Sequence, residues 1–199
     1  MKLYGSLTSP YVRKLRILVL EKHLKVDFLV EGPADAAGNV ARLNPLGKVP
    51  VFERDDGEVY FDSPMIAEYL DSLAAPALIP AAGEERWQVQ RWHALGQGVL
   101  DAVVARLMES RREAPVAAVM TKQEGKVQAA LAFAAARAPA SGFLVGQRLT
   151  LADIALAVAL DYVDLRYAHD WRGKHPTLAR WHAAMSARPS FAETLPPKG

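Results

Sequence analysis

The sequence predicts an α/β domain followed by an all-helical domain. Short apolar runs alternate with helix-like stretches in the first half, whereas the second half has long helical periodicity and no convincing strand. A segment rich in Ala, Pro and Gly separates the two halves. The chain has 199 residues, which suits two small domains. We therefore expect domains at 1–76 and 84–199, joined by a linker at about 77–83.

The first domain is expected to begin with a strand, a helix and a second strand. Lys2–Gly5 is a short strand candidate, and apolar residues at helical spacing then predict a helix over Pro10–Lys22. Val26–Val30 has the alternation of a half-buried strand. Because a helix connects the two strands, we expect them to pair in parallel. The small and polar stretch at 32–42 predicts a loop or a weak helix.

A hairpin and a helix are expected to complete this domain. Val49–Phe52 and Val59–Phe61 are apolar runs joined around Asp56-Gly57, which is a hairpin signal. Ser63–Pro64 then opens a helix, with Ser as the N-cap and Pro at the first helical position. The expected order of the domain is strand, helix, strand, weak helix, strand, strand, helix (βαβαββα).

The second half predicts four helices and a loose tail at 195–199. Thr150 and Asp153 have the spacing of a capping box, so we interpret Asp153 as a structural cap rather than a catalytic acid. The predicted helices cover Glu84–Arg112, Pro115 to about Arg137, a stretch from Thr150, and a stretch from His175-Pro176 to near Arg188.

Composition and charge exclude several classes of function. Lys and Arg number 24 against 22 Asp and Glu, so a net charge of +2 does not indicate a nucleic-acid binder. The absence of Cys removes disulfides, protein thiol nucleophiles and thiolate metal sites, and the five His residues lack metal-binding spacing. No metal is therefore expected. No apolar stretch approaches about 18 residues, and the start lacks an apolar signal core, so we expect a cytoplasmic protein without a membrane span.

Three short segments of the first half suit the binding of an anion or a zwitterion. Ser9 precedes a proline at a predicted helix start, where unpaired backbone N–H groups favour negative charge. The segment 44–50, NPLGKVP, is an ordered turn before a strand, and Pro50 is a candidate cis proline. Asp62 and Ser63 stand at the next helix start, where an ammonium group and a carboxylate would find partners. Plain helix capping is the alternative explanation for the Ser9 and Asp62–Ser63 segments.

In this order, the segments resemble one family over nearly the full length of the chain. SLTSPYVRKLRIL, NPLGKVPVF, FDSPMIAEYL and LTLADIAL are similar to segments of bacterial cytosolic-type glutathione S-transferases, with a serine-type active-site pattern like that of the theta, zeta and tau classes. The resemblance implies a thioredoxin-like first domain that binds glutathione as co-substrate. It also implies a helical second domain that lines a site for a small, apolar electrophile, and a homodimer.

The resemblance implies a role for Ser9 at the start of the first helix. By position, Ser9 would hydrogen-bond the glutathione sulfur and stabilise the thiolate. A helix N-terminus and a hydrogen bond to a charged group together supply the roughly 2.7 kcal/mol that lowers a thiol pKa by about two units. Tyr4 and Tyr11 are alternative donors, and we prefer Ser9 because it stands before the proline at the helix start.

The other two segments would hold the rest of glutathione. By resemblance, Val49 would pair through its backbone with the cysteinyl part, beside a cis Pro50. Asp62 and Ser63 would hold the γ-glutamyl end. The glycine carboxylate needs a donor, for which the candidates are Lys48, Arg42 and Asn39, with Lys48 preferred.

The site for the second substrate is less closely defined by the sequence. Leu7 and Tyr11 are candidate walls from the first domain, and Arg106, Leu107 and Ser110 are candidates from the long helix of the second. Arg106 stands in the apolar context AVVARLM. Its alternative role is an ion pair within the helical domain.

The expected function is transfer of glutathione to a small electrophile. Because the chain has no cysteine, thiol–disulfide exchange through a protein thiol is excluded. One alternative is a non-catalytic glutathione-binding or protein-interaction module on the same fold. Another is a specialised glutathione-dependent isomerase or dehalogenase. A Ser-His-Asp mechanism is disfavoured because the chain has no G-x-S-x-G turn.

Overall fold

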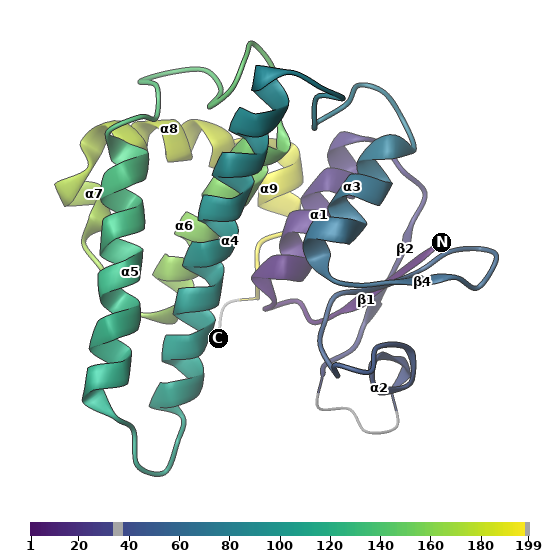
Figure 1. Ribbon diagram of the computed structural model, residues 1–199, viewed down its shortest axis with the longest axis horizontal. Coiled ribbons are helices and arrows are strands. Elements are labelled where there is room, and N and C mark those ends of the chain that lie inside the picture. Colours follow the sequence, from purple (N-terminus) through teal and green to yellow (C-terminus); the bar gives the residue numbers. More distant parts are fainter. Residues whose placement is uncertain (34–37, 198–199) are drawn as a thin grey trace. The chain divides into compact units, whose positions relative to one another are not determined.

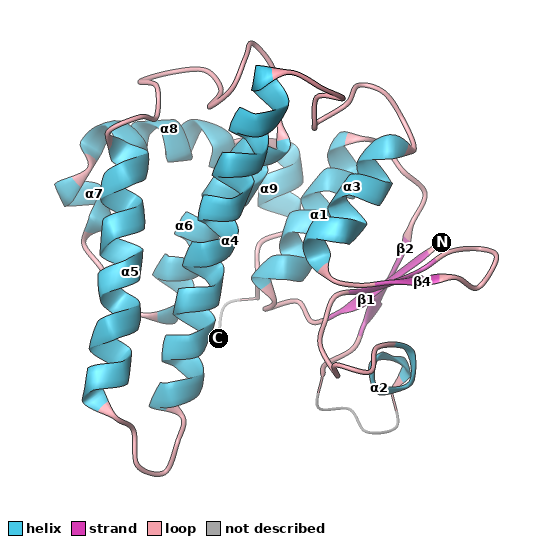
Figure 2. Cartoon of the chain, in the orientation of Figure 1, coloured by secondary structure: helices cyan, strands magenta, loops and turns pink. Residues whose placement is uncertain are grey.

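The computed structural model describes residues 1–33 and 38–197 and forms two compact units (Figure 1). The first unit comprises Met1–Ile79 and Pro189–Gly199, and the second comprises Pro80–Arg188. Strands occur in the first unit, and every regular element of the second is a helix (Figure 2). The α/β plus all-α fold class predicted from the sequence is therefore confirmed.

The first unit has the predicted order βαβαββα, followed much later in the chain by one short helix. Residues 34–37, within the stretch predicted as a loop or weak helix, lie outside the described residues. The elements are β1 (Lys2–Gly5), α1 (Pro10–Glu21), β2 (Asp27–Val30), α2 (Asn39–Leu43), β3 (Val51–Glu53), β4 (Val59–Tyr60), α3 (Ser63–Ser72) and α9 (Pro189–Glu193).

The sheet has the strand order β2-β1-β3-β4, with β1 parallel to β2 and antiparallel to β3. Tyr4 and Val51 are paired residues on one face, where they pack with Val40 of α2. Phe52 therefore points to the opposite face, and its ring lies 5.6 Å from that of Tyr69 in α3. The helices α1 and α3 pack side by side in this unit (Figure 1).

A buried ion pair joins the carboxyl ends of α1 and α3, and both of its side chains also hydrogen-bond the backbone of residues 76–79. Lys22 Nζ lies 2.6 Å from Asp71 Oδ1, with side chains 0% and 6% exposed. Lys22 also donates to the Pro76 carbonyl at 3.0 Å. The Asp71 carboxylate accepts from the backbone N–H groups of Leu78 and Ile79 at 2.7 and 2.9 Å. Both buried charges thus have hydrogen-bond partners, as burial requires.

The last helix, α9, belongs to the first unit, which departs from the expected boundary of 84–199. Phe191 is 1% exposed, and its carbonyl accepts from Arg13 Nη2 at 3.3 Å. Ser190 donates to Glu21 Oε1 at 2.5 Å. These contacts to α1 place the segment with the α/β unit. Of the tail predicted to be loose, 195–197 has no regular structure, and 198–199 lie outside the described residues.

The second unit is built around a buried helix. Residues 151–160 of α6 are all buried, and α6 packs on α4. A Cβ at Gly96 of α4 would lie 2.8 Å from the Ala155 backbone, so glycine permits this close approach. The elements of the unit are α4 (Glu84–Ser110), α5 (Ala117–Ala135), α6 (Leu151–Arg166), α7 (Trp171–Lys174) and α8 (Pro176–Ser186).

The predicted capping box at the start of α6 is confirmed. Asp153 Oδ2 accepts from the backbone N–H of Thr150 at 2.8 Å and from its hydroxyl at 2.9 Å, while Oδ1 accepts from Leu144 N at 2.8 Å. Burial raises the pKa of Asp153 despite these hydrogen bonds. All three partner groups lie within this unit, so the carboxylate has a structural role.

Within 1–33 and 38–197, no helix combines the length and the apolar character that crossing a membrane would require.

Replacing Asp71 with Ala should lower the free energy of unfolding by about 3–5 kcal/mol, because the buried Lys22 ammonium would lose its counter-ion. Chemical denaturation followed by circular dichroism measures this change. The matched control is Asp56→Ala, since the Arg54–Asp56 pair has the same 2.6 Å separation but side chains 34% and 55% exposed. Its loss should change stability little. Equal effects of the two substitutions would contradict the importance of burial.

Candidate functional site

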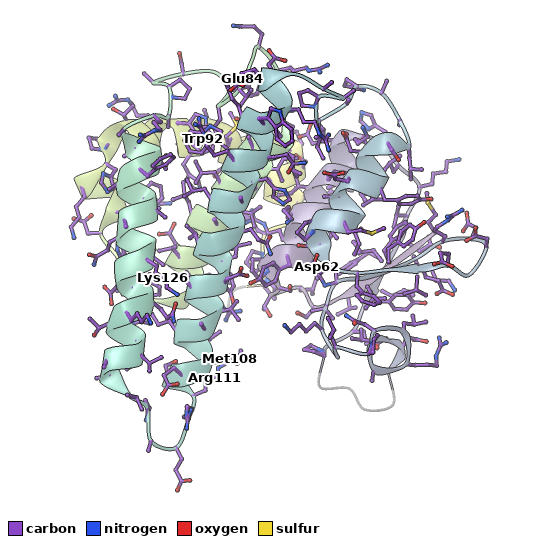
Figure 3. The ribbon with its side chains drawn as sticks, in the orientation of Figure 1. Asp62, Glu84, Trp92, Met108, Arg111 and Lys126 are labelled. Atoms are coloured by element: carbon purple, nitrogen blue, oxygen red, sulfur yellow. The ribbon has the colours of Figure 1, made fainter. Side chains whose placement is uncertain are left out.

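The three segments singled out from the sequence meet at one end of the strands, where β1 and β4 end and β3 begins, and this end is termed the sheet edge. The pair Tyr4–Val51 places Pro50 beside Gly5, at the carboxyl end of β1. Because Phe52 pairs with Tyr60 in the antiparallel strands β3 and β4, β4 ends at the same place, and Asp62 follows soon after it. Figure 3 labels Asp62 at the start of α3. Since β1 leads into α1 at this edge, the starts of α1, β3 and α3 converge there.

Ser9 is the N-cap of α1, as predicted, and Pro10 is the first helical residue. Its Oγ accepts from Val12 N at 3.4 Å, which is a long hydrogen bond. Its hydroxyl hydrogen has no acceptor among residues 1–33 and 38–197. The first turn of α1 contains no acidic residue, so the positive end of the helix dipole has no counter-charge within that turn. The half-buried hydroxyl is available as a donor.

Gly5 permits the close approach of β1 and α1 that positions this helix start. A Cβ at Gly5 would lie 2.3 Å from Cγ2 of Val12, a contact that no side chain could make. The glycine at the end of the first strand therefore sets where Ser9 lies relative to the sheet edge.

The turn before β3 is held by Asn44, a buried residue that the sequence analysis did not single out. Its Nδ2 donates to the Lys48 carbonyl at 2.8 Å, and its Oδ1 accepts from Leu46 N at 3.0 Å. The Val49–Pro50 peptide is cis, which confirms that expectation. No described residue hydrogen-bonds the Val49 backbone, so its N–H and C=O groups remain available at the sheet edge. The signal for Asn44 was its place before a proline in a tight turn.

The start of α3 differs from the prediction by one residue. The N-cap is Asp62, and Ser63 is the first helical residue, so the expected capping role of Ser63 is wrong. Ser63 is 1% exposed, and its Oγ is a buried atom without a hydrogen-bond partner in the described chain. The exposed Asp62 carboxylate forms no capping hydrogen bond. Capping therefore does not account for these two side chains.

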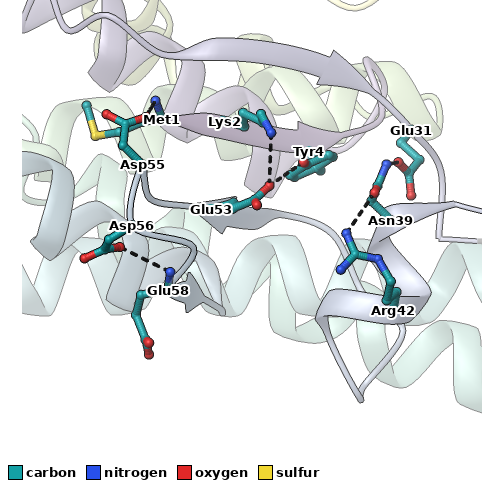
Figure 4. A network of polar contacts seen from close by, with 10 residues as sticks. All are labelled: Met1, Lys2, Tyr4, Glu31, Asn39, Arg42, Glu53, Asp55, Asp56 and Glu58. Carbon is teal, nitrogen blue, oxygen red and sulfur yellow. Dashed lines mark hydrogen bonds and ion pairs between the residues drawn. The ribbon is translucent and has the colours of Figure 1, made fainter.

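Arg42 and Asn39, two of the three residues expected to bind the glycine carboxylate of glutathione, hydrogen-bond each other (Figure 4). Arg42 Nη2 donates to Asn39 Oδ1 at 3.1 Å, and Asn39 Nδ2 donates to Glu31 Oε2 at 3.2 Å. Burial raises the pKa of Glu31, but hydrogen bonds from Val40 N and Asn39 outweigh it and leave the pKa below its usual value. The exposed Lys48 ammonium forms no hydrogen bond or ion pair with the residues described.

Tyr4, the alternative donor to the glutathione sulfur, already donates its hydroxyl hydrogen to Glu53 (Figure 4). Its hydroxyl donates to Glu53 Oε2 at 2.5 Å. Burial and the Glu53 carboxylate raise the pKa of Tyr4 to about 12. The side chain packs on the α2 face of the sheet. These contacts favour Ser9 over Tyr4 as the donor, while Tyr11 is half-buried on α1.

The residues expected around a second substrate lie in both units. Leu7 and Tyr11 are half-buried in the first unit, and Arg106, Leu107 and Ser110 are near the carboxyl end of α4 in the second. Arg106 Nε is 3.9 Å from a Glu124 carboxylate oxygen, which matches the expected ion pair. Ser110 donates to the Leu107 carbonyl at 2.8 Å. That these five residues share one site remains a prediction.

The described part of the chain contains no cluster of three or more His, Cys, Asp or Glu residues suited to a metal ion.

Comparison with known proteins identifies the family. A family model of the glutathione S-transferase N-terminal domain matches residues 3–78, and one of the C-terminal domain matches residues 88–184. The chain is 40% identical over 207 residues to the uncharacterized GST-like protein YibF of Escherichia coli, with 100% of both chains covered.

Solved structures agree over almost the whole chain. A glutathione S-transferase of Methylobacillus flagellatus with glutathione bound is 42% identical, with a TM-score of 0.93 over 98% of this chain and 99% of that one. One of Methylobacterium radiotolerans in complex with glutathione sulfonate is 35% identical, with a TM-score of 0.93 over 100% of this chain and 95% of that one.

A thioredoxin-like unit and a helical unit with these matches define a two-domain transferase fold. The chain belongs to the glutathione S-transferase family.

Ser63→Ala should leave the free energy of unfolding unchanged or raise it, because the substitution removes a buried hydroxyl without a partner. Asn44→Ala is the matched comparison from the same sheet edge. It should lower stability by about 1–3 kcal/mol, since the Lys48 carbonyl and the Leu46 N–H lose their partners. Denaturation of the ligand-free protein tests both. A large loss of stability in Ser63→Ala would show that its hydroxyl has an internal structural partner.

Proposed function

We propose that this protein binds glutathione and transfers it to a small electrophile, with Ser9 stabilising the thiolate. The observation that supports this most is the set of uncommitted polar groups at one sheet edge. They are the Ser9 hydroxyl hydrogen, the Val49 backbone and the buried Ser63 hydroxyl. Buried polar groups such as the Ser63 hydroxyl are normally hydrogen-bonded, so a ligand that supplies a partner there and to the other two groups fits this edge.

Each part of glutathione would meet a group of matching chemistry. The cysteinyl backbone would pair with the N–H and C=O groups of Val49 through main-chain hydrogen bonds. The γ-glutamyl carboxylate would accept from Ser63 at the start of α3, and the γ-glutamyl ammonium would meet Asp62. The glycine carboxylate would meet Lys48, whose ammonium forms no hydrogen bond or ion pair in the described chain. The family membership and the glutathione-bound relatives support this assignment.

The proposed role of Ser9 is to donate to the glutathione sulfur. A thiol with a pKa near 8.5 is only about 3% ionised at pH 7. A hydrogen bond to a charged group contributes about 1.5–3 kcal/mol, and a helix N-terminus adds about 0.3–1 kcal/mol. Together they can lower the thiol pKa by about two units without a general base.

The transfer itself would need no covalent step on the protein. The thiol proton leaves to solvent, and the thiolate sulfur forms a bond to an electrophilic carbon while the bond to a leaving group such as chloride breaks. A homodimer in the cytoplasm belongs to the same proposal, as the resemblance implies.

Ser9→Ala should still bind glutathione but should lower kcat/KM near pH 6.5 by about 10- to 100-fold, because the thiolate loses a charge-assisted donor. Ser9→Thr should retain most activity, and Tyr4→Phe should change it little. The readouts are turnover of a chlorodinitrobenzene and the ultraviolet absorbance of the bound thiolate. Full activity in Ser9→Ala, or a comparable loss in Tyr4→Phe, would overturn the role of Ser9.

Calorimetric titration with glutathione at pH 6.5, in two buffers of different ionisation enthalpy, tests the proposed function directly. Nearly one proton should be released with glutathione and none with S-methylglutathione. Binding without proton release would instead favour a non-catalytic glutathione-binding module. Absence of binding would show that the family resemblance extends to the fold alone.

Asp62→Asn and Ser63→Ala should each weaken glutathione binding by about tenfold or more, because each removes a partner of the γ-glutamyl group. Asp55→Asn is the control, since Asp55 pairs with the chain amino terminus at the far end of the hairpin. The same calorimetric titration gives the affinities. Unchanged affinity in both site variants would refute the γ-glutamyl assignment.

A further inference from the structure

The second unit contains a cluster of polar side chains with few partners, formed by Arg106, Tyr167, His169 and Glu124. Arg106 comes from the last turns of α4 and Glu124 from α5, while Tyr167 and His169 follow α6. The guanidinium carbon of Arg106 lies 4.1 Å from the centre of the Tyr167 ring. The Tyr167 and His169 rings meet edge to face at 5.8 Å. Figure 3 shows α4 beside α5, with Met108 and Lys126 labelled.

Hydrogen-bond donors exceed acceptors in this cluster. The Tyr167 hydroxyl, both ring nitrogens of His169 and the Arg106 Nε are buried, and none has a partner among residues 1–33 and 38–197. Glu124 approaches Arg106 Nε only to 3.9 Å, beyond hydrogen-bond distance. Buried polar groups without partners are uncommon, and here several gather around one guanidinium.

The protonation states keep these groups as donors at neutral pH. Burial and Glu124 raise the pKa of Tyr167 to about 12, so its hydroxyl stays protonated. Burial and Lys174 lower the pKa of His169, so its ring is neutral with one N–H donor. The Arg106 guanidinium supplies the positive charge of the cluster. The side chains of Arg106 and Glu124 are 23% and 36% exposed, so the cluster reaches solvent at this ion pair.

A carboxylate is the ligand that best matches these donors. A planar guanidinium presents two parallel N–H groups to a planar carboxylate. Stacking on the Tyr167 ring fixes the orientation of the Arg106 guanidinium. Tyrosine and histidine donors would complete the coordination of its oxygens. A dianionic phosphate fits less well, because Glu124 contributes a negative charge beside the single arginine.

We propose that Arg106, Tyr167 and His169 bind the carboxylate of a small organic molecule, so that the protein favours electrophiles that bear a carboxylate. The preference for such electrophiles rests on the proposed transferase function, whereas carboxylate binding does not. Glu124 would compete with a bound carboxylate for Arg106. The two side chains should therefore have opposite effects on carboxylate binding. Removing the Arg106 charge should weaken carboxylate binding, whereas removing the Glu124 charge should strengthen it.

The first experiment measures equilibrium binding of 4-chloro-3,5-dinitrobenzoate without glutathione, with the uncharged 4-chloro-3,5-dinitrobenzamide as reference. The chain has no cysteine thiol to react with this probe. Arg106→Gln should weaken benzoate binding at least tenfold, and Glu124→Gln should strengthen it severalfold, with the amide unaffected. Tyr167→Phe should weaken it by a smaller factor.

Arg137→Gln is the matched control. Arg137 also stacks on an aromatic ring, with 3.8 Å to the centre of Phe133, but it is exposed and donates to the Phe133 carbonyl at 3.3 Å. Its substitution should leave benzoate binding unchanged. A purely structural role of the cluster predicts that Arg106→Gln and Glu124→Gln shift benzoate binding in the same direction or leave it unchanged. Either result would overturn the proposal.

The second experiment compares kcat/KM for the benzoate and the amide as electrophiles with glutathione. A preference for the benzoate that falls at least tenfold in Arg106→Gln identifies the electrophile as the source of the carboxylate. Arg106-dependent benzoate binding without that preference identifies a separate carboxylate ligand and overturns the selectivity. If no variant turns over the amide, the transferase function fails, and the binding experiment alone still decides whether the carboxylate site exists.

Discussion

The candidate site depends on the antiparallel pairing of β3 between β1 and β4. Because Tyr4 pairs with Val51 and Phe52 pairs with Tyr60, the end of β1, the start of β3 and the end of β4 share one edge. Side chains alternate between faces along a strand, so a slip of one residue would turn the α2-facing residues toward α1 and α3. The same register therefore fixes both the core and the edge at which α1 and α3 begin.

The polar groups of the first unit fall into two kinds that differ in how completely they are partnered. The buried Lys22–Asp71 pair and the Tyr4–Glu53 hydrogen bond are satisfied within the fold. The buried hydroxyl of Ser63, at the sheet edge, has no partner in the described residues. This exception is informative, because leaving a buried hydroxyl without a hydrogen bond costs about 1–3 kcal/mol.

The sequence predicted the elements whose signals are local. The capping box at Thr150, the Asp56-Gly57 hairpin and the Ser9 cap each depend on residues close together in the chain. Long-range partners left no such signal: nothing near Lys22 indicated Asp71, and nothing in 84–188 indicated that Phe191 would pack on α1. The start of α3 was misplaced by one residue because Asp and Ser are both good caps, and only the backbone decides between them.

The absence of cysteine suggests one explanation for the polar groups at the sheet edge of the first unit and for the Arg106 cluster of the second. A chain without thiols supplies no sulfur nucleophile of its own, so under the proposed function it would bind, orient and stabilise charge on a thiol that a ligand brings. Donors without internal acceptors suit that task, as at Ser9 and Ser63 in the first unit. The Arg106 cluster has the same excess of donors in the second unit. Each unit would then recognise negative charge on its own ligand, a thiolate in one and a carboxylate in the other.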